Sequence, residues 1–263
     1  MANIMIASGK YIDEANALSA TSESAYPVTN LQNLQPTKIW RNSSTSATID
    51  IDLGSARTVT MAALLHTNLS ATATWRVHMA SSQARLGNSD YIGAVNDFFD
   101  GNDRDSWDRI SGVNVFASSK TYQWMRLVLS DASNVDGYLE AGRVFADNAW
   151  IPSINMHYNW SLGYKDDSRH TPTIGGQTIV TARGTRREIK FELGHLTEAE
   201  MYDNAFDLDR NRGSSKDILV VKDYENTTYV NDQIIHGTSR TLQPIINERY
   251  GIFKKRYLVT ELT

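Results

Sequence analysis

Ile39-Trp40-Arg41, followed by Thr48-Ile49-Asp50-Ile51-Asp52-Leu53-Gly54, is the stretch of sequence that decides the fold of the first half of the chain. In its second segment Ile49, Ile51 and Leu53 alternate with polar neighbours. A two-residue period is typical of a β-strand that has one buried face and one solvent-facing face. We therefore expect this half of the chain to form a β-sandwich.

More strands are expected on the C-terminal side of this stretch. Residues 83–119 lack the alternation and are rich in Gly, Asn, Asp and Ser, which predicts a long connection. Long ordered loops often carry binding contacts. The expected strands of this half are residues 47–53, 57–66, 73–80, 122–129 and 138–146.

These strands resemble those of the galactose-binding, discoidin-type jelly roll. The resemblance lies in the tryptophan ahead of a strand ending in Asp-Leu-Gly, the aromatic-Arg-Leu strand at 122–129 and the Leu-Glu strand that begins at Leu139. It covers residues 27–147 and departs from the family in having no cysteine pair at the domain ends. Because such sandwiches serve sugar-binding, protein-binding and structural roles, the resemblance implies a fold and leaves the function open.

Trp40 and Arg41 have two possible uses in such a sandwich. They lie near the loop end where this fold often binds ligands, and an aromatic ring beside a guanidinium suits stacking on a sugar. Alternatively, Trp40 fills the bottom of the core, which is the commoner place for a large aromatic side chain. We therefore assign no ligand-binding residue from sequence.

The composition limits the classes of function. The 263 residues include 30 acidic and 26 basic side chains, well mixed along the chain, for a formal charge of −4. No basic stripe suits a phosphate backbone, so we expect no direct nucleic-acid partner. The absence of cysteine excludes disulfides and thiolate chemistry. The sequence has no secretion signal and no apolar run long enough for a membrane span, so we expect synthesis in the cytoplasm and no membrane insertion.

The second half of the chain has a different pattern, which begins after Asn148-Ala149-Trp150-Ile151-Pro152. A helix is expected from Thr197, because Thr197 and Glu200 form the capping-box pattern, and Gly213 should end it. Strands are expected at residues 186–193, 217–223, 228–235 and 252–262. This succession predicts an α+β domain with one main helix.

Side chains that could support catalysis or bind a metal are scattered. The acidic loop lacks the spacing of a calcium loop, so we expect a solvated turn, and Gly175-Gly176 fits a hairpin turn better than a phosphate-binding loop. No histidine pair has the spacing of a zinc-binding helix. We predict no enzyme, no cofactor, and no catalytic or metal-binding residue. The residues considered are His66, His78, His157, His170, His195 and His236, with Asp97, Asp100, Asn102, Asp103 and Asp105 of the acidic loop.

The second half resembles the ring-forming domains of tailed bacteriophage tail tubes and distal tail proteins. The resemblance is carried by the Arg-rich strand at Arg186-Arg187, the helix start Leu196-Thr197-Glu198-Ala199-Glu200 and the closing strand Tyr257-Leu258-Val259-Thr260-Glu261-Leu262. It implies three parts: an extended N-terminal arm at residues 1–36, a galactose-binding-like sandwich at 37–149 and a tail-tube-like assembly domain at 150–263.

The combination implies a structural virion protein of the phage tail tip, a distal tail or baseplate component. As a cyclic homo-oligomer it would join the tail tube to the hub or fibres, and residues 11–36 could become ordered on a neighbouring copy. Two arginine clusters could pair with acidic groups of a neighbour or remain solvated: Arg183, Arg186 and Arg187, and Arg210 and Arg212. The alternative is a carbohydrate-binding module that recognises a host surface glycan. A glycan hydrolase is a third possibility to which no motif points.

Overall fold

The computed structural model describes residues 3–98, 109–226 and 228–263. The chain forms two compact units, of which unit 1 comprises Met1–Ile151 with Ile218–Ile234, and unit 2 comprises Pro152–Asp217 with Ile235–Thr263. Residues 218–234 thus belong with the N-terminal half of the chain.

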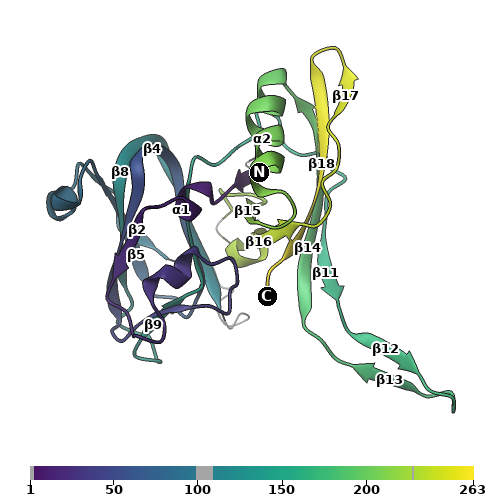
Figure 1. Cartoon of the computed structure of the whole chain (residues 1–263), viewed down its shortest axis with the longest axis horizontal. Helices are drawn as coiled ribbons and strands as arrows, with labels where there is room; N and C mark the ends of the chain where they lie inside the picture. Colours follow the sequence, from purple (N-terminus) through teal and green to yellow (C-terminus); the bar gives the residue numbers. More distant parts are fainter. Residues whose placement is uncertain (1–2, 99–108, 227) are drawn as a thin grey trace. The chain divides into compact units, whose positions relative to one another are not determined.

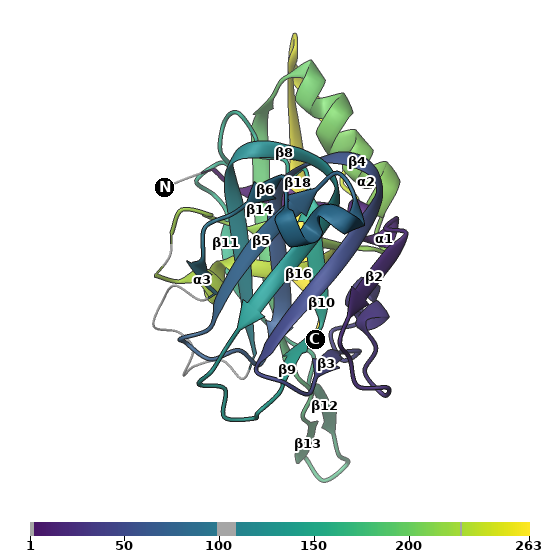
Figure 2. The same cartoon turned by 90° about the vertical axis from the view of Figure 1, so that its left-hand side faces the viewer.

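Unit 1 is a β-sandwich organised around two long antiparallel strands, β4 (Ser46–Thr67) and β8 (Ile110–Ser130). In the strand order β10-β4-β8-β5-β6, further strands extend the sheet on both sides (Figure 2). A small second sheet pairs the strand that contains Trp40 with the Leu-Glu strand. The shorter strands are β2 (Ala17–Ala20), β3 (Trp40–Asn42), β5 (Thr74–Ala80), β6 (Tyr91–Ile92), β7 (Asn96–Asp97), β9 (Leu139–Ala141) and β10 (Arg143–Asp147).

The alternating pattern places its side chains as predicted, but the strand boundaries differ. Ile49, Ile51 and Leu53 are buried, as the period of two requires. The turn expected between residues 53 and 57 is instead an irregularity within β4, where the register against β8 shifts between Asp52 and Arg57. Gly54 has a φ of 80° there, a value that glycine adopts without strain. One bent strand therefore replaces the two predicted ones.

The long loop predicted at residues 83–119 is wrong for its last part, because β8 begins at Ile110. This stretch is rich in Ser, Gly and Asn, which have low strand propensity. It forms a strand because residues 110–115 pair with residues 61–67 of β4. Pairing with a neighbouring strand has overridden local preference.

The middle of β4 is buried on both faces. Ala62 and Leu64 belong to the main core of the sandwich, together with Trp40 and Trp75. Met61, Ala63 and Leu65 face a second core that also contains Met5, Phe145, Leu219 and Ile234. Residues 218–234 thus pack within unit 1 because they cover this second face.

The N-terminal segment is an integral part of unit 1. Its first strand, β1 (Met5–Ala7), pairs with β15 (Asp217–Val221), and β2 pairs with β4. The short helix α1 (Lys10–Asp13) buries Ile12, and Leu31 is fully buried as well. Residues 11–36 therefore pack on the sandwich of their own chain, whereas the sequence left open that they become ordered on a neighbouring copy.

The strand predicted at residues 228–235 is wrong over most of its length. Val230–Gln233 form a single helical turn, α3, and the strand β16 runs from Ile234 to Ser239. The turn is closed by the Gln233 amide, which donates to the Tyr229 carbonyl at 3.2 Å. The Asn231 side-chain oxygen accepts the Ser111 amide at 2.8 Å. This contact ties the turn to β8, 120 residues away in the sequence.

Unit 2 is an antiparallel sheet with one main helix. Its strands follow the order β16-β18-β14-β11, and β17 pairs with the outer part of β18. The helix is a π-helix over Glu200–Phe206 that continues as α2, Asp207–Arg212. Gly213, with a φ of 55°, ends it as predicted. The strands are β11 (Ser161–Asp166), β14 (Thr185–Leu196), β17 (Ile246–Arg249) and β18 (Ile252–Glu261).

A hairpin continues from the ends of β11 and β14. Its strands β12 (Arg169–Pro172) and β13 (Thr178–Thr181) pair with each other, and Figure 1 shows them extending away from the rest of unit 2. The turn predicted at Gly175-Gly176 is confirmed, since the Thr173 amide donates to the Gln177 carbonyl at 2.7 Å. We call residues 167–184 the arm, and we refer to residues 1–36 as the N-terminal segment.

Candidate binding sites

Trp40 fills the core of the sandwich. Its side chain is 0% exposed, and the indole Nε1 donates to the Ser22 hydroxyl at 2.8 Å and to the Thr21 carbonyl at 3.2 Å. A ring with no exposed face cannot stack on a sugar. The sequence left open whether Trp40 stacks on a sugar or fills the core, and the structure shows that it fills the core.

Arg41 is also fully engaged within unit 1. Its guanidinium carbon lies over the rings of Tyr26 and Tyr138, 4.4 and 4.2 Å from their centroids. Arg41 Nε donates to the buried Glu140 carboxylate at 2.8 Å, and Arg109 donates to the other oxygen at 2.7 Å. Burial lowers the pKa of Arg41 and the bond to Glu140 raises it, with a net rise. Arg41 is thus held by two rings and one carboxylate of its own unit, and 23% of its side chain remains exposed.

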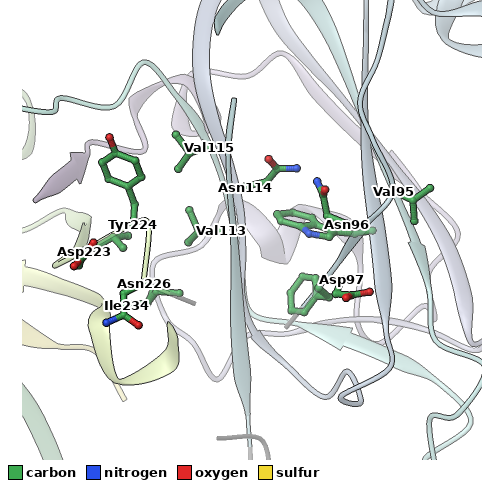
Figure 3. A pocket seen from close by; sticks show the side chains of 13 residues that line it. Val95, Asn96, Asp97, Val113, Asn114, Val115, Asp223, Tyr224, Asn226 and Ile234 are labelled. Carbon is green, nitrogen blue, oxygen red and sulfur yellow. The ribbon is translucent and has the colours of Figure 1, made fainter. Parts of the chain in front are cut away.

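A pocket of ≈ 450 Å³ in unit 1 is lined in part by residues of the predicted loop at 83–119. It lies against residues 113–115 of β8, and Figure 3 shows Val113 and Val115 on the side of Tyr224 and Asn114 on the side of Asn96. Alternate residues of a strand point to opposite faces, so the pocket reaches both sides of β8. In the described part, β8 pairs with β5 only from Trp124 to Ser130, and the edge of β8 near the pocket is not paired.

The pocket combines an apolar floor with uncharged and acidic polar groups. The floor includes Trp75 and Phe98, whose rings meet edge to face at 5.1 Å between centroids. The side chains of Asn96, Asp97 and Asn114 make no hydrogen bond to another described residue. Among the described residues, neither lysine nor arginine lines the cavity. The full lining is Trp75, Val95, Asn96, Asp97, Phe98, Val113, Asn114, Val115, Val221, Asp223, Tyr224, Asn226 and Ile234.

Such a lining suits a neutral ligand that is rich in hydroxyl groups. Carboxylates accept hydrogen bonds from hydroxyls, and carboxamides both donate and accept them. An anionic ligand would meet the carboxylates of Asp97 and Asp223 with no cation to balance them. Sequence reasoning missed Tyr224, Asn226 and Asn114, because the first two lie in residues assigned to the second domain and the third in a predicted loop.

The histidines and the acidic loop supply no metal site among the described residues, where no three His, Asp or Glu side chains are grouped as ligands. In unit 2, the rings of His157 and His195 are 5.4 Å apart, and His157 Nδ1 lies 3.6 Å from a Glu192 oxygen. Asp97 lines the pocket, whereas Asp100, Asn102, Asp103 and Asp105 lie outside the described residues.

Most of the arginines proposed to pair with a neighbouring subunit pair within their own chain. Arg186 pairs with Asp167, and Arg187 pairs with Glu261 in a buried contact. Arg210 bonds to Asp207 one helical turn away, and Arg212 bonds to Asp217. Of the two clusters only Arg183 has no ion-pair partner in the described part of the chain.

The two strands of the arm are exposed along their whole length. All residues of β12 and β13 are exposed, including Ile179 at 58% and Val180 at 54%, and Ile174 at the turn is completely exposed. An isolated two-stranded hairpin is marginally stable in water, and exposed apolar side chains mark interaction surfaces. The arm thus has the properties of a segment that another molecule covers.

Comparison with known proteins gives a similarity at the level of fold. No family model and no curated protein matches the chain. A family 32 carbohydrate-binding module of C. perfringens NanJ, solved with galactose, is similar with 14% identity and a TM-score of 0.41, covering 56% of this chain and 99% of that one. Chitosan-binding module 1 from a Paenibacillus chitosanase/glucanase has 12% identity and a TM-score of 0.38, covering 51% and 96%.

The family 32 module of AlyQ, in complex with 4,5-unsaturated mannuronic acid, has 17% identity and a TM-score of 0.37, covering 51% of this chain and 95% of that one. All three TM-scores lie below 0.5, so the similarities carry no functional conclusion. None of the three is a tail protein, and the tail-ring resemblance of residues 150–263 stays a prediction. No helix in the described ranges is long and apolar enough to cross a bilayer.

Proposed function

We propose that this chain is a structural assembly protein, and specifically the tail-tip or baseplate component that the sequence pattern implies. The exposed arm of unit 2 is the observation that carries the proposal. In the ring, the arm of one copy lies on the next copy, which covers Ile174, Ile179 and Val180. The proposal includes no catalytic step.

A covered arm explains why apolar residues occupy this hairpin. Burial of apolar surface is worth about 25 cal/mol per Å², so leaving these side chains in water forgoes stabilisation that a neighbour can supply. In the proposed assembly the arm of each copy meets a different surface on the next copy, which is a head-to-tail contact. Such contacts form a ring when the rotation between copies closes and an open filament when it does not.

Electron microscopy of the purified full chain tests the assembly. We expect closed rings, and we expect the substitutions Ile179→Asp and Val180→Asp together to abolish them without unfolding the subunit. Thr171→Asp, on the paired strand of the same hairpin, adds a charge without removing an apolar side chain and is the matched control. Rings that persist in the Ile179→Asp, Val180→Asp variant would contradict the role of the arm.

A second candidate function is glycan recognition by unit 1. The observation that favours it is the pocket of Figure 3, where the side chains of Asn96, Asp97 and Asn114, which bond to no other described residue, lie beside an apolar floor. Amides and carboxylates that contact sugar hydroxyls, with apolar groups below, are an arrangement suited to a neutral saccharide.

A glycan array tests this second function. Binding to a neutral saccharide should fall about tenfold in Asn114→Ala, because loss of a hydrogen-bonding side chain leaves ligand groups unpaired. Asn211→Ala, which lies in unit 2, should bind as the unaltered chain does. If no saccharide binds, or if both variants bind equally well, the pocket is not a glycan site.

A further inference from the structure

A second pocket, in unit 2, gathers three arginines from separate segments. Arg183 follows β13, Arg186 lies in β14 and Arg240 follows β16. The pocket has a volume of ≈ 320 Å³ and lies at the base of the arm. Its remaining lining residues are Asp167, Gly184 and Thr263.

The arginines outnumber the side-chain carboxylates in this pocket. Asp167 accepts from Arg186 Nε at 2.7 Å and so compensates one guanidinium. Arg183 and Arg240 are exposed and have no ion-pair partner among the described residues. The bond from Arg186 lowers the pKa of Asp167 despite partial desolvation, and the nearby charges of Arg186, Lys165 and Arg240 lower it further. Arg240 is therefore close enough for its field to reach the carboxylate.

We propose that this pocket binds a phosphate or sulfate group. Two nitrogens of Arg186 donate to a single oxygen of Asp167, Oδ2, so this carboxylate occupies only one of the three guanidiniums. Guanidiniums from three segments match a group that presents more than two acceptor oxygens around a centre. Gly184 leaves open space beside them, since a Cβ atom built there has no heavy atom within 4 Å.

The site is independent of ring formation and of the pocket in unit 1. A volume of ≈ 320 Å³ exceeds that of a lone phosphate or sulfate ion, so the proposed ligand is a tetrahedral oxyanion carried on a larger molecule. A sulfated saccharide and a phosphorylated one share this chemistry. The two ligands differ in whether the sugar carries a sulfate ester or a phosphate ester, and the experiment below measures the binding of each.

Isothermal titration calorimetry of the full chain with glucose 6-sulfate and glucose 6-phosphate, at constant ionic strength, tests the proposal. We expect saturable binding of one or both esters and a rise of about tenfold or more in Kd for Arg183→Gln combined with Arg240→Gln. The stronger ester identifies the source. Arg249→Gln removes an exposed charge elsewhere in unit 2 and should leave Kd unchanged.

Three results would overturn the proposal. One is the absence of saturable binding of either ester. Another is an equal loss of affinity in Arg249→Gln, which would indicate only a general effect of charge. The last is acetate binding as tightly as the esters, which would contradict the preference for a tetrahedral group. Thermal unfolding without ligand checks the fold of the variants, which should be retained because neither arginine is buried or paired.

Discussion

At the scale of single residues, burial decides how Trp40 is used. Because the ring is 0% exposed, Trp40→Ala should lower the free energy of unfolding by about 3–5 kcal/mol. Urea denaturation followed by circular dichroism measures the loss. A variant that kept its stability but lost affinity for a glycan would show that Trp40 is a sugar contact.

Asp147 is a buried carboxyl that ties the N-terminal segment to the sandwich. It accepts hydrogen bonds from the Ser8 amide and hydroxyl, both at 2.6 Å, and from the Gly9 amide at 2.8 Å. Burial raises its pKa, although these bonds oppose the rise. The contact spans 138 residues of sequence from Gly9, and nothing in the local pattern predicts it.

The raised pKa of Asp147 determines whether its contribution to folding stability increases or decreases with pH. The folded chain holds the Asp147 proton more tightly than the unfolded chain, so this contribution to stability is full at acidic pH and is lost as pH rises through the folded-state pKa. In Asp147→Asn the contribution is absent. The measured quantity is the free energy of unfolding of the native protein minus that of the variant, from urea titrations. This difference should decrease from acidic to neutral pH. A relative stability that increases with pH would contradict this assignment.

At the scale of elements, the helix start confirms the capping box that the sequence predicted. The Glu200 amide donates to the Thr197 hydroxyl at 3.2 Å, and the Thr197 amide donates to the Glu200 carboxylate at 3.1 Å. Thr197→Ala should cost about 1 kcal/mol in thermal or urea unfolding, whereas Thr197→Ser keeps the acceptor and should cost little. Equal losses in both variants would mean that the threonine methyl, rather than the cap, stabilises the helix.

A buried charge cluster connects the end of this helix to the sheet of unit 2. Asp217 accepts from Arg212 at 2.6 Å and contacts His236 Nε2 at 2.9 Å, and all three side chains are 2% exposed. Asp217→Ala leaves a buried guanidinium uncompensated and should destabilise unit 2 by about 3–5 kcal/mol. Glu248→Ala breaks only the exposed pair with Lys254 and should cost less than about 1 kcal/mol. Comparable losses in the two variants by urea unfolding would contradict the importance of burial.

Elements with a strong local signal were predictable, and those that depend on distant partners were not. Strand β5 is confirmed because Trp75, Val77 and Met79 share its buried side. The first part of β8 has no such period, and it is a strand because β4 pairs with it. The same limit applies to the two pockets, whose lining residues come from segments that only the fold brings together.

At the scale of the whole molecule, the chain passes between its two units more often than the sequence indicates. A single boundary near residue 150 was expected, yet Ile218–Ile234 belongs to unit 1. Residues 218–221 of β15 are apolar without interruption, so they could be buried in either unit. A continuous apolar run has no alternation that would indicate which unit buries them. Only the core around Phe145 and Leu219 shows where it packs.

Assembly is the property of the whole molecule on which the proposed function depends. The arm is long, exposed and apolar at Ile174, Ile179 and Val180, and a second copy of the chain is the partner proposed to cover it. Replacing Arg169–Thr181 by a two-residue Asn-Gly turn removes the hairpin and keeps the pair between Asp167 and Arg186.

Sedimentation equilibrium of the native chain and of this shortened variant is the most direct test. The native chain should have the mass of a closed oligomer that does not change with concentration, and the shortened chain should have the mass of a monomer. A native chain that is monomeric at high concentration, or a shortened chain that assembles as the native one does, would contradict the account.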